Sequence, residues 1–275
     1  MARVVLGIEY DGSAFAGWQV QRDRRTVQAC LERAVAKVAT APVELVCAGR
    51  TDAGVHALQQ VAHFDSAARR DQRSWMLGIN CNLPDDVRVL WARPAVADFH
   101  ARSSAIARYY RYVILNRGMR SALGPRQTTW CYYPLDAERM QAAADHLIGD
   151  HDFSSFRAQG CQSNSPRRFM HRIRVRREGD RVTLEICANA FLHHMVRNIA
   201  GVLMEIGAGK REPEWTRELL ERKDRSLAGV TAPAAGLYLA GVLYPEHCGL
   251  PRDPWFDQLP PGIDRYRPAP LIPSV

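Results

Sequence analysis

The chain has 275 residues and a formal net charge of +8, with 47% hydrophobic and 24% charged residues. This composition is that of a globular protein and excludes a disordered chain, a collagen and a coiled coil. No apolar run approaches the roughly 18 residues of a membrane span, and Val4 to Ile8 is shorter than the core of a signal peptide, roughly 7 residues or more. We therefore expect a cytoplasmic protein with no membrane partner.

The positive charge comes almost entirely from arginine, because only Lys37, Lys210 and Lys223 among the 37 basic residues are lysine. Arginine forks match phosphate groups. A codon bias explains the ratio of arginine to lysine equally well, but it does not explain the net excess of positive charge. A polyanionic partner is therefore one interpretation. The seven cysteines are widely spaced with no C-x-x-C pair, which indicates neither a disulfide framework nor a thiolate zinc site.

The first predicted elements are a strand and a helix. Val4 to Tyr10 is an apolar run that ends in a turn, which is typical of a strand. Thr26 is a helix N-cap, and a buried helical stripe follows it until Pro42 ends the helical region. This stripe consists of Val27, Cys30, Leu31, Ala34, Val35 and Val38.

A hairpin, a second helix and a last strand complete the first half. Val43 to Ala48 and residues 61–65 are strand-like, with turn residues between them. Asp71 to Leu83 has helical spacing, and Val87 to Trp91 alternates as a strand. The order β-α-β-β-α-β is the ferredoxin-like arrangement.

The second half repeats this order with different residues, so we expect an α+β fold of two ferredoxin-like subdomains. The chain should divide near residues 98–104, giving subdomains at 1–100 and 101–245 and a proline-rich tail at 246–275, which we expect to be a poorly ordered extension. The predicted elements are strands at 106–115, 173–177, 182–187 and 237–243, and helices at 136–148, within 192–209 and at 213–222.

The densest polar cluster is the connection from Ala48 to His56, which lies between two predicted strands. Loops on a rigid sheet often carry function. The same residue types also form ordinary turns, because Asp and Gly satisfy turn backbones without any chemistry. The pattern alone therefore leaves both interpretations open.

The run Gly49-Arg50-Thr51-Asp52-Ala53-Gly54-Val55-His56 resembles the catalytic motif of the TruA family of tRNA pseudouridine synthases. The resemblance covers roughly residues 3 to 245. It favours a functional role for Asp52 over the interpretation as an ordinary turn residue. Its other motifs, in chain order, are Tyr10-Asp11-Gly12 with Gly17-Trp18-Gln19, Arg108-Tyr109-Tyr110-Arg111-Tyr112, Asp152-Phe153 with Phe156, Asn189-Ala190-Phe191 with His194-Met195-Val196-Arg197-Asn198, and Gly236-Leu237-Tyr238-Leu239.

The resemblance implies the pseudouridine synthase fold, with the active-site cleft between the two subdomains. It also implies isomerisation of uridine to pseudouridine at positions 38, 39 and 40 in the anticodon stem-loop of tRNA. The family uses no cofactor and no metal, and it is generally homodimeric. We therefore expect tRNA and a second copy of the chain as partners, and no small-molecule cofactor.

The resemblance makes Asp52 the catalytic residue. Breaking the N-glycosidic bond leaves positive character at C1′, so an ionised carboxylate can add covalently or take a proton from the sugar. Arg197 resembles the basic residue that pairs with this aspartate, and a guanidinium neighbour can lower a carboxylate pKa by roughly 1 to 3 units. Arg50 resembles a residue that helps to evert the target nucleotide or fills its place.

Two further residues are expected to contact the uracil. Tyr110 resembles the active-site tyrosine whose ring stacks on the base and whose hydroxyl takes part in proton removal. Leu237 resembles the aliphatic residue that packs against the base. From the strand pattern alone, core packing explains either side chain as well.

Clusters of arginine supply candidate contacts to RNA phosphates. We select Arg22, Arg24 and Arg168 for this role, since a folded tRNA is recognised largely through its backbone. Solvated surface arginine is the alternative for each cluster.

Two other functions fit parts of the sequence. Tandem β-α-β-β-α-β units also describe paired RNA recognition motifs in a non-catalytic RNA-binding protein, although the aromatic signature of such motifs is missing. A synthase of the same chemistry that acts on another RNA is the second alternative.

Overall fold

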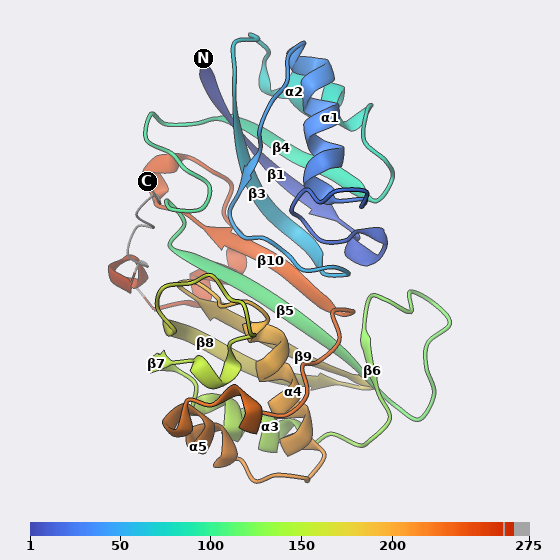
Figure 1. Ribbon diagram of the computed structural model, residues 1–275, viewed down its shortest axis with the longest axis vertical. Helices are drawn as coiled ribbons and strands as arrows, with labels where there is room; N and C mark the ends of the chain where they lie inside the picture. Colours follow the sequence, from blue (N-terminus) through green and yellow to red (C-terminus); the bar gives the residue numbers. More distant parts are fainter. Residues whose placement is uncertain (261, 267–275) are drawn as a thin grey trace. The chain divides into compact units, whose positions relative to one another are not determined.

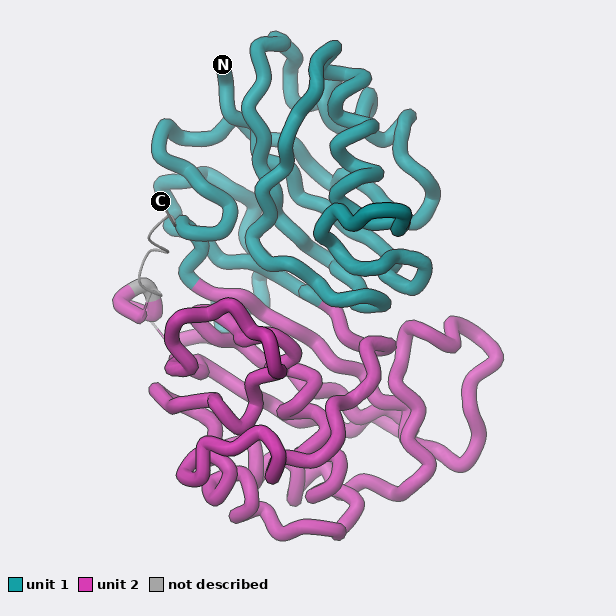
Figure 2. Tube along the Cα trace, in the orientation of Figure 1, with its two compact units in different colours: residues 1–106, 239–258, 269–275 teal, residues 107–238, 259–268 magenta. Residues whose placement is uncertain are grey.

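The computed structural model describes residues 1–260 and 262–266, and these fall into two compact units. Unit 1 holds residues 1–106 and 239–258, and unit 2 holds residues 107–238 and the described part of 259–268 (Figure 2). The chain therefore leaves unit 1 a few residues after the predicted boundary. It returns to unit 1 within the last strand, because contacts in space and not sequence order define a compact unit.

Unit 1 has the predicted order of elements, and its strands form an antiparallel sheet. The strands follow the order β4-β1-β3 (Figure 1), and β2 pairs with β3 along the edge opposite β1, which is the ferredoxin-like arrangement. The elements are β1 (Ala2–Tyr10), α1 (Val27–Ala39), β2 (Val46–Cys47), β3 (His56–Ser66), α2 (Gln72–Asn80) and β4 (Val87–Pro94).

Helices α1 and α2 pack together and bury their apolar sides on this sheet (Figure 1). The stripe predicted for α1 is the buried one, with Leu31 and Val35 fully covered. Phe64 of β3 meets Trp75 of α2 edge to face, with ring centroids 5.2 Å apart. The core of unit 1 thus fixes β3, the strand that follows the Asp52 loop.

Unit 2 is built around the antiparallel strand order β5-β9-β8-β7, with β6 parallel to β5. The short strands β6 and β7 are additions to the prediction, because three or four residues without apolar alternation carry no strand signal. The elements are β5 (Ala107–Asn116), β6 (Thr129–Cys131), α3 (Ala137–Asp145), β7 (Gly149–Asp152), β8 (Arg167–Glu178), β9 (Arg181–Ala188), α4 (Met195–Gly207), α5 (Trp215–Arg222) and the start of β10 (Leu237–Leu243).

The proline-rich segment is packed over much of its length. Residues 246–258 include two short 3-10 helices, and they bury Trp255 and Phe256 in unit 1. In unit 2, the ring of Tyr266 stacks on Phe169 with centroids 3.6 Å apart. The expected poorly ordered extension therefore does not describe residues 246–260, because two large aromatic side chains offset the ordering entropy. Residue 261 and residues 267–275 lie outside the described residues.

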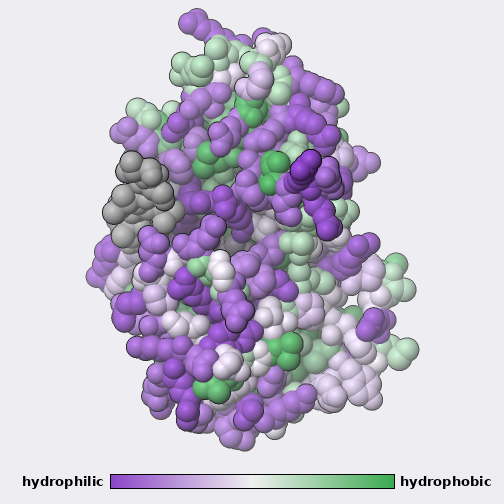
Figure 3. Space-filling model, in the orientation of Figure 1, coloured by the Kyte–Doolittle hydropathy of each residue, from purple (hydrophilic) through white to green (hydrophobic). Residues whose placement is uncertain are grey.

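No helix among the described residues combines the length and the apolar character needed to span a membrane. Hydrophilic side chains cover most of the face seen in Figure 3, and the apolar spots on it are small and separate.

Candidate active site

Asp52 lies in the loop of residues 48–55, which joins β2 to β3 in unit 1. The loop starts at a backbone hydrogen bond from Ala48 N to Val61 O of 2.7 Å, and it turns where Val55 N donates to Asp52 O at 3.1 Å. The side chain of Asp52 is half-buried, whereas Arg50 is exposed. A carboxylate in this position is held at the surface of a rigid hairpin and can be reached from solvent.

The loop packs against the segment that follows β1. Trp18 N donates to Thr51 O at 3.0 Å, and Gly54 N donates to Phe15 O at 3.3 Å. Trp18 is almost fully buried, so its backbone is a fixed support. The backbone on both sides of Asp52 is therefore tied to a second segment of unit 1.

Two glycines permit this close approach. A Cβ on Gly12 would lie 1.9 Å from Val55 O, and one on Gly17 would lie 2.7 Å from Thr51 O. Gly17 also has a φ of +95°, which side chains other than glycine rarely adopt. The motif that contains Gly12 and Gly17 thus packs directly against the run from Gly49 to His56, and its glycines leave the space that this contact needs.

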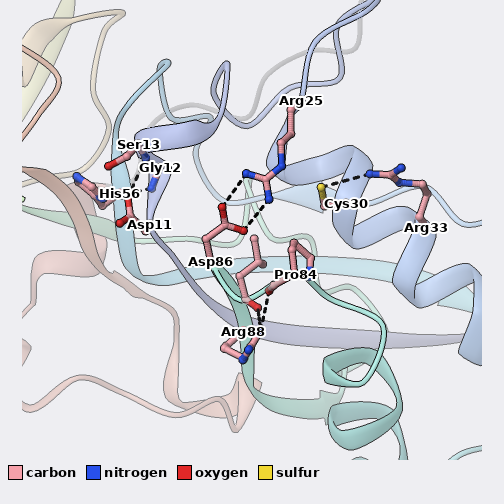
Figure 4. Close-up of polar contacts among 11 residues, drawn as sticks. Asp11, Gly12, Ser13, Arg25, Cys30, Arg33, His56, Pro84, Asp86 and Arg88 are labelled. Carbon is pink, nitrogen blue, oxygen red and sulfur yellow. Dashed lines mark hydrogen bonds and ion pairs between the residues drawn. The ribbon is translucent and has the colours of Figure 1, made fainter. Parts of the chain in front are cut away.

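Polar contacts hold the end of β1 in place next to this loop (Figure 4). Asp11 Oδ1 lies 3.1 Å from His56 Nδ1, and Gly12 N also approaches this ring nitrogen at 3.2 Å. Asp11 N donates to Asp86 O, and the carboxylate of Asp86 receives two hydrogen bonds of 2.6 and 2.7 Å from Arg25. These contacts join three loops of unit 1 into one support.

The arginines near this support differ in their surroundings. The guanidinium of Arg25 lies 4.0 Å from the centroid of the Phe15 ring and is engaged by Asp86. Arg24 is exposed, and the side chain of Arg22 is 97% exposed with a distant contact of 3.8 Å to Asp23. Arg22 and Arg24 are thus accessible to a polyanion, as the phosphate-contact prediction requires.

Arg168, the third predicted phosphate contact, is a buried residue of β8 in unit 2. Its Nη1 donates to Ser165 O and Arg167 O, and its Nη2 donates to Ser163 Oγ at 2.7 Å. Burial lowers the pKa of the Arg168 guanidinium from its usual value. Its hydrogen bonds thus hold the loop before β8, and an RNA contact would have to be made alongside them.

Tyr110 lies in β5 of unit 2 and is 9% exposed. Its ring meets that of Phe191 edge to face, with centroids 4.9 Å apart. Tyr112, two residues on, is fully buried, and its hydroxyl donates to Pro233 O at 2.9 Å. Burial raises the pKa of Tyr112 above its usual value. Of these two tyrosines, Tyr110 is the one whose edge remains at the surface.

Arg197 lies in the first turn of α4, with its side chain half-buried. Its Nε donates to Ala232 O at 2.8 Å, and Ala232 N donates to Arg197 O at 3.1 Å. Leu237, the first residue of β10, is 4% exposed and follows Gly236, whose φ is +79°. Arg197 and Leu237 are therefore held at the ends of regular elements, where side chains are precisely placed.

Comparison with known proteins adds an independent finding. The family model described as tRNA pseudouridine synthase matches residues 7–102 and 143–245, which is well over half of the chain. The chain belongs to the tRNA pseudouridine synthase family. A tRNA pseudouridine synthase A of Methylococcus capsulatus is 65% identical to it over 97% of this chain and 98% of the relative. Those of Nitrosococcus oceani and Coxiella burnetii are 56% and 54% identical, covering 91% and 92% of this chain and 96% and 97% of the relatives.

The family match includes most of the predicted site residues. Arg50 and Asp52 fall in its first segment and belong to unit 1, whereas Arg197 and Leu237 fall in its second segment and belong to unit 2. Tyr110 lies outside both matched segments, within the wider similarity to the curated relatives. Residues predicted for the site thus occur in both units of this synthase.

Sequence reasoning did not name Gln60, and it assigned no role of their own to Tyr10 and Thr51, which belong to the quoted motifs. Gln60, Thr51 and Tyr10 form buried hydrogen bonds that support the Asp52 loop. One signal was present in the sequence, because Gln60 interrupts a strand whose following residues are apolar. A polar amide in such a strand requires a partner.

Proposed function

We propose that this chain isomerises uridine to pseudouridine in tRNA, at positions 38, 39 and 40 of the anticodon stem-loop. The observation that carries the proposal is the family match over residues 7–102 and 143–245, which includes a half-buried, reachable Asp52 on a fixed loop. The proposed site consists of amino-acid side chains, and the proposal includes no cofactor and no metal. The reaction rearranges one nucleotide and needs no second substrate.

Asp52 is the proposed catalytic residue. The bond between C1′ and N1 of the uridine breaks, and the uracil leaves with the electron pair. The carboxylate either adds to C1′ or takes a proton from the sugar, and both roles need an ionised oxygen. After the uracil has turned, its C5 bonds to C1′, while the carboxylate leaves C1′ or gives its proton back to the sugar. The hydrogen on C5 then leaves as a proton, and N1 gains one. Substrate and product are therefore isomers.

The two roles of Asp52 predict different isotope effects. If the carboxylate takes the proton from C2′, a substrate with deuterium at C2′ reacts several-fold more slowly in single turnover. If the carboxylate adds to C1′, the same substitution leaves the rate almost unchanged, because no bond to that deuterium breaks. The measurement uses a short RNA with one labelled uridine.

Residues of unit 2 complete the proposed chemistry. Tyr110 stacks on the uracil, a contact that contributes roughly 1 to 3 kcal/mol, and its hydroxyl group takes part in removing the C5 proton. Arg197 pairs with the catalytic carboxylate, and its Nε hydrogen bond to Ala232 O fixes the plane of its guanidinium. Leu237 packs against the base. The proposal thus requires both units to act on one nucleotide.

The remaining predicted residues handle the RNA. The target base must leave its stack, at a cost of roughly a few kcal/mol, and the exposed Arg50 helps by taking its place. Arg22 and Arg24 bind phosphates from their exposed loop. Arg168 contributes mainly by ordering the loop before β8, to which its guanidinium is bonded.

We also propose that the protein works in the cytoplasm as a homodimer. The seven cysteines all lie within the described residues and form no disulfide, which is typical of a reducing compartment. The dimer rests on the family resemblance, and light scattering of the purified protein tests it. A mass of twice 30.9 kDa is the expected result, and a monomer at working concentration would contradict it.

The activity test uses several unmodified tRNA transcripts with uridine at positions 38, 39 or 40. We expect pseudouridine at these positions, mapped by mass spectrometry after nuclease digestion. Pseudouridine at other tRNA positions or in another RNA would overturn the assigned substrate, whereas the proposed reaction would stand. No product with any of the transcripts would overturn the proposed function.

A further inference from the structure

A buried polar side chain in β3 has no explanation in the packing of the core. Gln60 is fully buried, and so are Val61 and Ala62, which follow it. A primary amide in such a place is costly unless its donors and acceptor are bonded. Gln60 Nε2 donates to Gly49 O at 2.6 Å, and its Oε1 accepts from Gly49 N at 3.4 Å. The amide thus binds both backbone groups of one loop residue.

The same amide reaches a second contact to the loop. Gln60 Nε2 donates to the hydroxyl of Tyr10 at 3.5 Å, and this hydroxyl lies 2.7 Å from Thr51 Oγ1. Tyr10 and Thr51 are 2% and 6% exposed, so solvent does not replace these bonds. Three buried side chains therefore form one hydrogen-bonded chain from β3 and β1 to the loop.

The network binds the loop residues on both sides of Arg50. It binds Gly49 and Thr51, and Arg50 lies exposed between them, directly before Asp52. Thr51 is held on its other side as well, because Trp18 N donates to its carbonyl oxygen. The loop has no regular secondary structure of its own at these positions. Its shape around Arg50 and Asp52 thus depends on contacts to other segments.

We propose that Tyr10, Thr51 and Gln60 are positioning residues, which set the placement of Arg50 and Asp52 without contacting the substrate. This inference rests on the proposed function for its activity readout. The physical reason is that a reacting group displaced by about 1 Å can lose about 10²-fold in rate. If the network only stabilised the fold, its polar side chains could be substituted by apolar ones with little change in turnover.

The first test compares two substitutions at one position. Thr51→Val keeps the shape of the side chain and removes its hydroxyl, whereas Thr51→Ser keeps the hydroxyl. We expect Thr51→Val to lower kcat by about 10 to 100-fold with KM for tRNA within about 3-fold, and Thr51→Ser to retain kcat within about 3-fold. An unchanged kcat for Thr51→Val, or a loss expressed only in KM, would overturn the proposal.

The second test uses the free protein, so it does not depend on the reaction. Hydrogen exchange of the backbone amides of residues 49–52 should become at least about 10-fold faster in Gln60→Leu and Tyr10→Phe, while the exchange of α1 stays as in the parent protein. Gln59→Leu is the matched control, because Gln59 is half-buried and points to the other face of β3.

The two tests separate the two proposals. If the parent protein makes no pseudouridine, the proposed function fails, and the exchange measurement alone decides the role of the network. If exchange of residues 49–52 is the same in Gln60→Leu as in Gln59→Leu, the network does not hold the loop and the positioning role is refuted. If Gln60→Leu and Tyr10→Phe unfold at a much lower temperature and α1 exchanges faster in them, the network residues serve the whole fold. That outcome also refutes the positioning role.

Discussion

The two units place their proposed site residues in different ways. In unit 1, Asp52 and Arg50 lie on an irregular loop that is shaped by hydrogen bonds from other segments and by the missing side chains of two glycines. In unit 2, Tyr110, Arg197 and Leu237 lie in a strand, in the first turn of a helix and at the start of a strand. A loop needs a dedicated support, whereas a strand or helix positions side chains through its own backbone. The Asp52 loop is therefore the more sensitive of the two regions.

The largest expected effect is the loss of Asp52 itself. Asp52→Asn keeps the size of the side chain and removes the ionised oxygen, so turnover should fall by at least about 10³-fold while tRNA binding stays within a few-fold. Steady-state pseudouridine formation and filter binding measure the two quantities. Asp85→Asn is the control, because Asp85 is fully exposed in the same unit. Unchanged turnover in Asp52→Asn would contradict the catalytic role of Asp52 and assign it to another residue.

A comparison within β5 separates chemistry from packing in unit 2. Tyr110→Phe should lower kcat by about 10²-fold with little change in thermal stability, because the hydroxyl serves as an acid or base. Tyr112→Phe should keep kcat and destabilise the fold by about 1 to 2 kcal/mol, because the Tyr112 hydroxyl donates to Pro233 O in a buried place. Kinetics and urea unfolding of both variants provide the measurement. The reverse pattern would assign the catalytic hydroxyl to Tyr112.

One buried histidine in each unit should make stability depend on pH. Burial lowers the pKa of His63 in unit 1 and of His171 in unit 2 to about 4 in each case. The unfolded chain, with a histidine pKa of about 6.5, binds more protons between these values, so the free energy of unfolding falls as the pH drops from about 6.5 to about 4.

The expected loss is at most about 1.4 kcal/mol per pH unit for each histidine. Urea unfolding at pH 7 and pH 5 measures it. Replacing both residues in His63→Gln/His171→Gln should flatten the dependence between these pH values. An equally steep loss in that double variant would show that other groups carry it.

The smallest effect is expected from the exposed arginines of unit 1. Arg22→Gln/Arg24→Gln should raise KM for tRNA by about 2 to 5-fold, leave kcat unchanged, and reduce the slope of log K against log salt by about 1 for each lost phosphate contact. Arg69→Gln/Arg70→Gln is a matched control with the same charge change at an exposed pair. Equal effects from the two double variants would mean that only net charge matters.

Local patterns were sufficient for most elements and for the Asp52 loop. The burial stripe of α1 and the alternation of the long strands are short-range signals, and the structure has these elements at the predicted places within a few residues. Thr26 directly precedes α1, as predicted, but its side chain makes no capping hydrogen bond. The run from Gly49 to His56 is contiguous, so a single stretch of sequence identifies it. Short strands such as β6 lack this signal, because partners far away in the chain create them.

The sequence by itself thus determined the order of the long elements, the family and the candidate catalytic carboxylate, since residues close together in the chain carry the signal for each. Only the tertiary structure decided that Gln60 and Tyr10 support the loop, that Arg168 is buried while Arg22 is exposed, and that Trp255 is packed into unit 1. These facts depend on which distant segments meet. Hydrogen bonds between distant residues, and burial in a segment without helical or strand periodicity, depend on such meetings. No local pattern of residues fixes them.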